Sequence, residues 1–163
     1  MSTKPSTEPT DRKKVAHYLS QVLADNYVLY TKTQNFHWNV IDPRFYQLHK
    51  LWEEQFEDLA EANDLFAERI RMLQIRTPAS LKQFLTLTCL KESEEILTGD
   101  EMLEELVNDH ETMIKNLHVG IQLATKLADD GTADLFIQRL RAHEKMAWFL
   151  RSHLEQNKKN RSK

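Results

Sequence analysis

The sequence predicts an all-α protein that folds as a single bundle of four long helices. Only three glycines and four prolines occur among its 163 residues, while Leu, Glu, Lys and Ala, which favour helices, are abundant throughout. Apolar residues recur every three or four positions over four long segments, which is the period of an amphipathic helix. The length is ample for one domain with its own hydrophobic core and short for two.

The first helix is predicted over residues 11–39. Its apolar residues, from Val15 to Phe36, follow helical spacing, and the pattern breaks at residues 41–44, which include a proline. Residues 1–10 contain two prolines and no apolar pattern. They are therefore predicted to form a flexible N-terminal tail.

The second helix is predicted over residues 45–73, where an apolar stripe of about eight turns is wide enough to face the core of a bundle. A long connection follows, from about Gln74 to Leu97, and contains Pro78. Within it, residues 79–85 are predicted to form a short helix.

The third helix is predicted to begin after Thr98 and to continue to Ala128. Thr98 and Glu101 have the spacing of a capping box, in which the side chain of each residue binds the backbone N–H of the other. Gly131 is predicted to end the next connection. Thr132 is predicted to be the N-cap of the fourth helix.

A long crossover between the second and third of four helices is typical of a ferritin-like bundle, rather than of an up-down bundle with three tight turns. The bundle is predicted to occupy residues 11–157. The basic residues 158–163 are predicted to fray into a C-terminal tail.

The composition argues against a membrane or exported protein. No apolar run approaches the roughly 20 residues that cross a bilayer, and the first 14 residues lack the apolar centre of a signal peptide. The single cysteine, Cys89, cannot form an internal disulfide, which fits a reducing, cytoplasmic location. We expect Cys89 to be buried and inert, with a reactive thiol as the alternative.

The charge is unevenly distributed along the chain. Residues 1–14 carry four basic and two acidic groups, and residues 155–163 carry four basic groups and one acidic group. Since the net charge is -3, the segment between them carries -8. An acidic body with basic ends suits a protein that handles cations and whose tails contact a polyanion.

Four residues on the first two predicted helices form candidate metal ligands. If these helices are antiparallel neighbours, His37 and His49 lie side by side and both imidazoles point at one ion. Asp64 and Glu68 are four residues apart, which places them on one helix face. Such ligands suit Fe(II) and also accept Zn, Mn or Co. The alternative is that the histidines are core-edge residues and the carboxylates a solvated face.

These ligands cannot meet within one chain. A rise of about 1.5 Å per residue separates Asp64 from His49 by roughly 22 Å along the second helix. A second copy, turned about a two-fold axis through the middle of this helix, would bring the histidines of one subunit to the carboxylates of the other. The predicted site therefore lies between subunits.

Three segments of the first half closely resemble the Dps (DNA-binding protein from starved cells) or mini-ferritin family. They are NFHWNV at residues 35–40, FYQLHKLWEE at 45–54 and DLFAER at 64–69. LVNDHE at residues 106–111, and the motifs DDGTADLF and HEKMAWFL within 129–150, resemble the third and fourth helices of that family. The resemblance covers nearly the whole chain except its termini.

This resemblance implies a dodecameric shell that oxidises Fe(II), preferably with hydrogen peroxide, stores ferric iron and protects DNA. It implies ferroxidase ligands at His37 and His49 of one subunit and at Asp64 and Glu68 of its two-fold partner. Glu53 matches a further carboxylate that helps to hold a second, weaker iron. Conventional ferritins instead use Glu-x-x-His pairs within one bundle. No histidine of this chain has a glutamate three residues before it.

Four further residues have two interpretations each. Trp38 and Trp52 are close in sequence to the histidine ligands and are expected to pack at an interface, with a redox role for Trp52 as the alternative that the resemblance allows. Asp130 and Asp134 are at the start of the fourth helix, where a carboxylate favours the helix dipole. The resemblance places them around a three-fold pore, where three copies would draw Fe(II) inward.

Two rival functions remain open from the sequence. The first is a DNA-compacting protein, whose contacts come from basic residues near the two ends of the chain and weaken with salt. These residues are Lys4, Arg12, Lys13, Lys14, Lys158, Lys159, Arg161 and Lys163. The second is a shell-forming protein that handles no iron. The remaining five histidines fit no ligand pair and are interpreted as structural: His17, His110, His118, His143 and His153.

Overall fold

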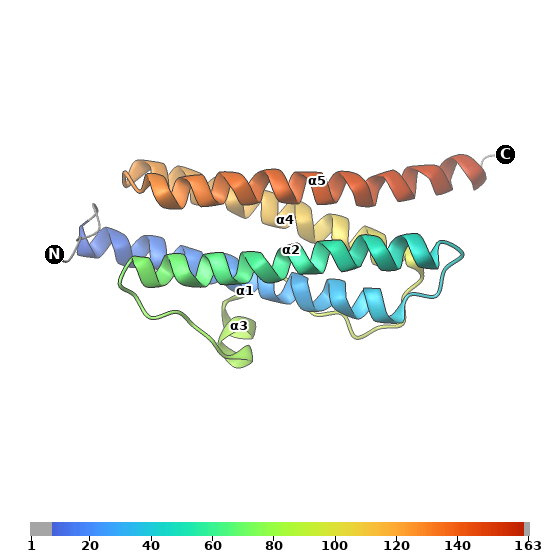
Figure 1. The fold of residues 1–163 in the computed structure, drawn as a ribbon, viewed down its shortest axis with the longest axis horizontal. Helices are drawn as coiled ribbons and strands as arrows, with labels where there is room; N and C mark the ends of the chain where they lie inside the picture. The colour runs from blue at the N-terminus through green and yellow to red at the C-terminus, as the bar shows by residue number, and fades with distance from the viewer. Residues whose placement is uncertain (1–7, 162–163) are drawn as a thin grey trace.

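The structure is a computed structural model and describes residues 8–161, with side chains up to Leu154. It contains five helices and, within the described residues, no strand. The helices are α1 (Pro9–Asn39), α2 (Phe45–Met72), α3 (Leu81–Leu87), α4 (Gly99–Lys126) and α5 (Asp130–Arg161). The predicted four-helix bundle with a short helix in its long crossover is therefore confirmed (Figure 1).

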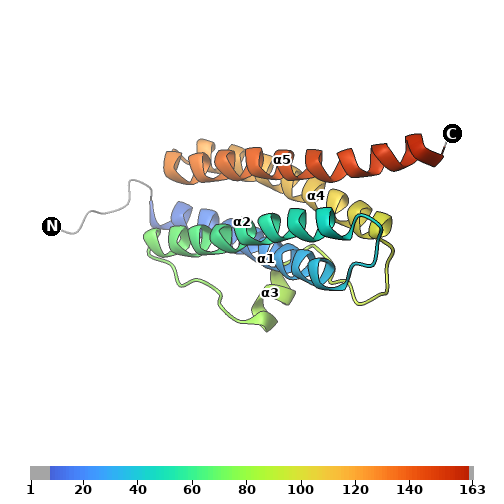
Figure 2. The same cartoon turned by 45° about the vertical axis from the view of Figure 1, so that its right-hand side comes forward.

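Two helical hairpins make up the bundle. One consists of α1 and α2, which lie side by side, and the other of α4 and α5 (Figures 1 and 2). The hairpins meet mainly where α1 packs against α4, and α2 and α5 make few direct contacts. The crossover carries α3 along the outer side of α1, opposite α5. The α1–α2 turn and the α4–α5 turn lie at opposite ends of the bundle.

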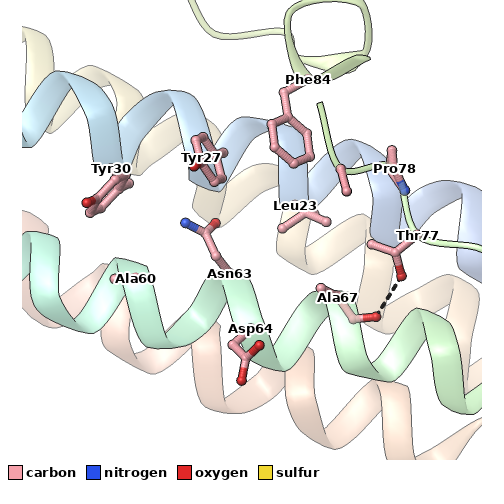
Figure 3. Close-up of a pocket in the computed structure, with 11 residues that line it drawn as sticks. Leu23, Tyr27, Tyr30, Ala60, Asn63, Asp64, Ala67, Thr77, Pro78 and Phe84 are labelled. Atoms are coloured by element: carbon pink, nitrogen blue, oxygen red, sulfur yellow. Dashed lines mark hydrogen bonds between the residues drawn. The ribbon is translucent and has the colours of Figure 1, made fainter. Parts of the chain in front are cut away.

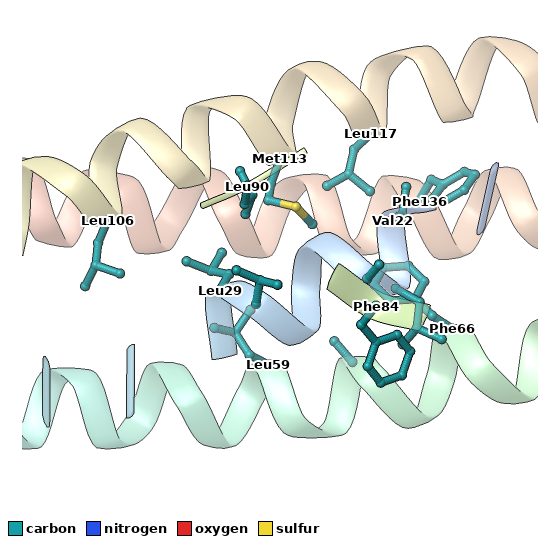
Figure 4. Close-up of a cluster of buried hydrophobic side chains, with 14 of the residues drawn as sticks. Val22, Leu29, Leu59, Phe66, Phe84, Leu90, Leu106, Met113, Leu117 and Phe136 are labelled. Carbon is teal, nitrogen blue, oxygen red and sulfur yellow. The ribbon is translucent and has the colours of Figure 1, made fainter. Parts of the chain in front are cut away.

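One continuous hydrophobic core fills the space between the hairpins (Figure 4). Its largest fully buried aromatic side chains are Phe36, Trp52, Phe66 and Phe136. Burying a side chain of this size contributes roughly 1.5–3 kcal/mol relative to leaving it exposed. Gly120 lies where α4 closely approaches its neighbours, because a Cβ there would be 2.8 Å from the Phe136 ring.

The two predicted N-caps differ in outcome. The Thr98 capping box is confirmed: Glu101 accepts from the Thr98 amide at 2.7 Å, and Thr98 accepts from the Glu101 amide at 3.3 Å. The Thr132 cap is wrong, because α5 starts earlier. Asp129 accepts hydrogen bonds from the Thr132 amide (3.1 Å) and hydroxyl (2.7 Å) and therefore serves as the cap. Gly131 accordingly lies inside the first turn of α5.

Two helix ends extend beyond their predicted limits. α1 begins at Pro9 rather than Asp11, because proline fits the first helical turn, where its missing N–H has no helical partner to bind. α5 continues to Arg161, past the predicted boundary at residue 157. Lys158 and Lys159 therefore lie on the last turns of a helix.

A buried aspartate fixes the crossover to the bundle. Asp25 on α1 is 2% exposed and accepts hydrogen bonds from the Thr88 hydroxyl (2.7 Å), the Cys89 amide (2.7 Å) and the Asn116 side-chain amide (3.0 Å). Since Asp25 anchors the Cys89 backbone, the side chain of this residue stays at the surface. The prediction that Cys89 is buried is therefore wrong. Its thiol is nonetheless poorly ionised, since partial desolvation raises the pKa of Cys89.

Two histidines lie entirely inside the bundle. His110 on α4 and His143 on α5 are 0% exposed, and their Nδ1 atoms are 2.9 Å apart. Burial lowers the pKa of His110 to about 3. Burial, the neighbouring His110 and Arg139 lower the pKa of His143 well below its ordinary value. Both imidazoles are therefore neutral at physiological pH.

Acid is expected to destabilise the bundle through this pair. The unfolded imidazoles titrate near pH 6.5, whereas in the fold they stay neutral to much lower pH. Below about pH 6.5 the unfolded state therefore binds more protons, and the free energy of unfolding falls with decreasing pH. We expect the double variant His110→Leu/His143→Leu to show a shallower fall between about pH 6.5 and 4 in denaturant titrations. The exposed control His118→Leu should keep the parent slope; an equal slope in the double variant would contradict a neutral buried pair.

Two helices end in a left-handed residue that is not glycine. Gln74 and Ala128 have φ of 65° and 55°. At the end of α4, the Asp129 amide donates to the Ala124 carbonyl and the Ala128 amide to the Thr125 carbonyl, which is the Schellman pattern. A Cβ in the left-handed region costs roughly 1–2 kcal/mol.

Glycine at these two positions is expected to stabilise the protein. Gln74→Gly and Ala128→Gly should each raise the free energy of unfolding by about 0.5–1 kcal/mol, since the relief of strain exceeds the entropy that glycine adds to the unfolded chain. Gln122→Gly, at an exposed position inside α4, should instead lower it by a similar amount. Chemical denaturation of the three variants tests this, and destabilisation by both glycine caps would refute it.

Candidate functional site

His37 and His49 lie face to face where α1 ends and α2 begins. His37 is in the last turn of α1, and His49 follows the start of α2 by one turn. Because the connecting turn is short, the two helices run antiparallel and bring both rings together. The ring centroids are 3.8 Å apart and the planes differ by 14°.

The two histidines fix each other's protonation pattern. The Nδ1 of His37 is 2.7 Å from the His49 carbonyl oxygen, and the Nδ1 of His49 is 2.9 Å from the His37 carbonyl oxygen. A carbonyl only accepts, so each Nδ1 carries the hydrogen and donates it. In each neutral ring, the lone pair is then on Nε2. This is how metal-binding histidines are commonly oriented, with one nitrogen bonded to the protein and the other facing the metal.

Aromatic rings and a salt-bridge cluster hold this pair in place. Phe45 stacks on His49 at 5.0 Å, and Phe56 contacts His37 edge-on at 5.1 Å. In the turn, Arg44 binds Asp42 at 2.7 Å and Asp100, at the start of α4, at 2.8 Å. The hydrogen bonds from Arg44 lower the pKa of Asp42 and keep it ionised.

A third potential ligand from the same chain lies close to the pair. Glu53 is one turn beyond His49 on α2 and bonds to Lys50. This hydrogen bond is the largest cause that lowers the pKa of Glu53. A spacing of four residues puts Glu53 on the same face of α2 as His49. The carboxylate of Glu53, which a second metal ion would require as a ligand, is therefore already bound to Lys50.

Asp64 and Glu68 are exposed at the far end of α2, 15 and 19 residues after His49. Along a helix these intervals correspond to about 22 and 28 Å. Among the residues that the structure describes, no group of three or more His, Cys, Asp or Glu side chains is placed to hold a metal ion. One chain thus presents an imidazole pair and a carboxylate pair that remain separate.

Asp64 borders a cavity of about 360 Å³ between α1, α2 and the segment that leads to α3. Tyr27 and Phe84 stack at 4.6 Å on one side of this cavity. Figure 3 shows Asn63 on the side of α2 that faces the tyrosines, while Asp64 points away from them. The carboxylate of Asp64 therefore projects outward from the protomer.

The two tryptophans have different environments. Trp38 is 65% exposed, next to His37, and remains a candidate for interface packing. Trp52 is completely buried and packs against Phe36 at a centroid distance of 6.1 Å. Interface packing is therefore wrong for Trp52, because the apolar stripe of α2 points it into the core of its own subunit.

Asp130 and Asp134 lie in the first two turns of α5 at the end of the bundle opposite the α1–α2 turn. Both are exposed, and Asp134 accepts a hydrogen bond from Gln138 at 2.7 Å. A single protomer presents these carboxylates to solvent. The three-fold pore stays a prediction.

The residues predicted to bind DNA are divided between the two ends of the bundle. Lys4 and Lys163 lie outside the described residues. Arg12, Lys13 and Lys14 are in the first turns of α1, where Lys14 bonds to Asp11 at 3.0 Å. Lys158, Lys159 and Arg161 belong to the end of α5.

Across the helices described here, none is sufficiently long and apolar to span a membrane.

Sequence reasoning missed the elements that orient the histidines. The reciprocal bonds to the His37 and His49 carbonyls depend on the exact approach of two helix ends, which residue spacing does not specify. The Arg44 cluster had a local signal in the sequence Asp42-Pro43-Arg44, since aspartate two residues before a helix start often binds the turn. Arg44 also contacts Asp100, which is 56 residues away in sequence, and no local sequence signal indicates that contact.

Comparison with known proteins identifies the family of this chain. The model of the ferritin-like domain matches residues 16–159. An uncharacterized low temperature-induced protein of Nostoc sp. is 41% identical over 88% of this chain and 82% of its own length. DNA protection during starvation protein 2 of Bacillus anthracis is 35% identical over 88% of this chain and 99% of its own.

Solved structures show the same fold. The Dps protein of Vibrio cholerae O1 superposes with a TM-score of 0.87 at 30% identity, over 91% of this chain and 93% of that one. Dps from Thermosynechococcus elongatus gives a TM-score of 0.86 at 33% identity, over 89% and 92% of the two chains. In sequence and in fold, this chain therefore belongs to the Dps or mini-ferritin group of the ferritin-like family.

Proposed function

We propose that this protein is a mini-ferritin that oxidises Fe(II) at sites shared between two subunits, stores the ferric product inside a dodecameric shell and thereby protects DNA from oxidative damage. The observation that carries this proposal is the His37–His49 pair, which presents two Nε2 lone pairs and has no complete ligand set among the described residues of its own chain. The names of several relatives refer to DNA protection. The Vibrio cholerae protein is described as a ferritin-like diiron-carboxylate protein.

A two-fold axis across the middle of α2 completes the site. It superimposes the His37 end of one subunit on the Asp64 end of its partner, so that each dimer forms two identical sites. Large apolar side chains flank both halves and are exposed in the protomer: Trp38, Phe45, Tyr46 and Leu65. Exposed apolar groups clustered around both half-sites are typical of a surface that a partner covers.

The site would bind Fe(II) as its substrate. Two neutral imidazoles and the carboxylates of Asp64 and Glu68 give a ligand charge that balances a divalent ion, and Zn, Mn or Co would accept the same ligands. Glu53 would contribute to a second, weaker iron once Lys50 has moved away. Two Fe(II) ions each give one electron to hydrogen peroxide, the O–O bond breaks, and two protons complete two water molecules. Because both electrons pass to one peroxide, no hydroxyl radical is released.

The acidic body supports the delivery of iron. Three copies of Asp130 and Asp134 around a three-fold axis would focus a negative potential and draw Fe(II) into the shell. Such a protein would work in the cytoplasm, close to the nucleoid if it also binds DNA. The basic residues near the start of α1 and the end of α5 favour DNA compaction as a second function, since a dodecamer would present many copies of each.

Complementation between variants tests the shared site. His37→Ala/His49→Ala and Asp64→Ala/Glu68→Ala should each abolish rapid oxidation of Fe(II) by peroxide in stopped-flow experiments. Shells refolded from an equal mixture should regain about a quarter of the parent sites, because a site is intact only when histidines and carboxylates come from different variants.

The control for this experiment is His17→Ala/His118→Ala, which removes two exposed histidines that are not among the proposed ligands and should leave the rate unchanged. Mixed shells no faster than either variant alone would refute the shared site, provided that light scattering shows all shells to be dodecameric. A full rate in either double variant would refute the ligand assignment.

DNA binding through the ends of the chain would depend on salt. A gel shift at low salt is expected to weaken steeply as salt increases, because each contact with a phosphate releases counterions. Deletion of residues 1–10 and 158–163 should reduce the shift at low salt without affecting Fe(II) oxidation. A shift that survives this deletion unchanged would rule out Lys4 and the basic residues of 158–163 as the DNA-binding elements.

A further inference from the structure

A layer of buried polar side chains crosses the bundle where α2, α4 and α5 meet. Gln55 donates to the Met146 carbonyl at 3.4 Å and connects α2 to α5. Arg139 binds Asp58 and makes a second connection between the same helices. His110 and His143 connect α4 to α5 through their Nδ1 atoms. Gln55, His110, Arg139 and His143 are all at most 7% exposed.

Five buried polar atoms of this region have no hydrogen-bond partner among the described residues. They are Trp52 Nε1, Gln55 Oε1, His110 Nε2, Arg139 Nε and His143 Nε2. A buried polar atom left unpaired costs roughly 1–3 kcal/mol, and native proteins pair at least about 90% of such atoms. Five of them in one region of a single bundle therefore point to a bound polar ligand.

Four of the five atoms belong to segments of α2 and α5 that contact each other, and the fifth, His110 Nε2, belongs to the ring that is paired with His143. On α5, residues 139, 143 and 146 are three or four positions apart and share one face. They span about 10 Å along the axis. On α2, residues 52, 55 and 58 share a face in the same way, and the contacts of Gln55 and Asp58 place this face against α5. Arg139 is one turn before His143 on α5, and its positive charge lowers the pKa of both His110 and His143.

The chemistry of these atoms selects the ligand. One hydrogen lies between the two Nδ1 atoms, so one neutral ring carries its hydrogen on Nδ1 and the other on Nε2. The pair therefore presents one Nε2 donor and one Nε2 acceptor. Trp52 and Arg139 add donors and Gln55 adds an acceptor. An anion would satisfy only the donors and a cation only the acceptors, whereas water satisfies both.

A route from solvent leads to this layer. A cavity of about 150 Å³ lies between α2 and α5, and Gln55 and Met146 both line it. Glu54 and Lys145 are exposed at its edge. Gln55, whose Oε1 is one of the unpaired atoms, brings the cavity to the α2 side of this layer, and Met146 brings it to α5 within one turn of His143. Its volume is large enough to hold water, and Glu54, Gln55, Asp58 and Lys145 give its lining polar groups.

We propose that this layer is an internal hydration site, in which ordered water enters between α2 and α5 and binds the Nε2 atoms of His110 and His143. This water adds a connection between α2 and the α4–α5 hairpin, where α2 and α5 make few direct contacts along their whole length. The layer is separate from the site formed by His37 and His49, and it is expected whether or not the protein oxidises iron.

A crystal structure of the full-length protein at 1.5 Å or better tests this proposal. We expect ordered water within about 3.2 Å of each Nε2, with the Nδ1 atoms still paired. The proposal would be overturned if both rings are well ordered and neither Nε2 atom binds water, or if a protein side chain binds each of them. The test needs only the parent protein and does not depend on the folding of a variant.

Variants give an independent measurement. His110→Leu and His143→Leu alone should each destabilise the protein, because each leaves the other ring and its water without a partner. The double variant should be less destabilised than the sum of the two, since it removes both partners and the need for water. Its crystal structure should lack the water molecules that bind the two Nε2 atoms in the parent protein. Strictly additive losses, with the control His118→Leu neutral, would contradict a coupled hydrated pair.

Discussion

The stiffness of α2 determines how this protein can bind metal. A continuous helix from Phe45 to Met72 keeps His49 and Asp64 about 22 Å apart, and no rearrangement of side chains closes that distance. The chain therefore carries an imidazole pair and a carboxylate pair that do not meet. Because His49 and Asp64 lie on the same helix, the two-fold axis that we propose would complete two sites at once. Assembly and metal binding would then both depend on one geometric constraint.

The half-site with the histidines is held from several directions. The carbonyl groups at the α1 and α2 ends fix both tautomers, Phe45 and Phe56 fix the rings, and Arg44 ties the intervening turn to α4. Two further ion pairs connect the α1–α2 hairpin to the α4–α5 hairpin. Arg69 binds Asp129 at the α4–α5 turn, and the nearly buried Lys32 binds Asp109 on α4 at 2.7 Å. The apolar core gives the bundle its cohesion, and these pairs set its register.

Much of the fold could be predicted from the sequence because its main determinant is the period of apolar residues. That period located all four long helices, and the capping box located the start of α4 correctly. Competition between equivalent signals caused the errors. Asp129 and Thr132 are both good caps, and only the structure shows that Thr132 donates to Asp129. Gln74 and Ala128 end their helices without the glycine that usually marks such a position.

The candidate site was less predictable than the fold. Spacing along α2 is sufficient to show that His49 and Asp64 cannot share an ion within one chain. It carries no information about contacts between distant segments. The Cys89 side chain lies at the surface because Asp25 anchors its backbone, and Trp52 lies in the core because its position on α2 faces inward. Both outcomes follow from tertiary packing.

The locked orientation of His37 and His49 has a consequence for metal selectivity. A half-site whose lone pairs are already aligned binds its first ion without reorganisation, and therefore offers little means to reject one divalent ion in favour of another. Imidazole and carboxylate ligands bind Cu²⁺ and Zn²⁺ at least as strongly as Fe²⁺. Preference for iron would then arise from turnover. Iron that is oxidised would leave the proposed site as mineral, whereas a redox-inert competitor such as zinc would remain bound and act as an inhibitor.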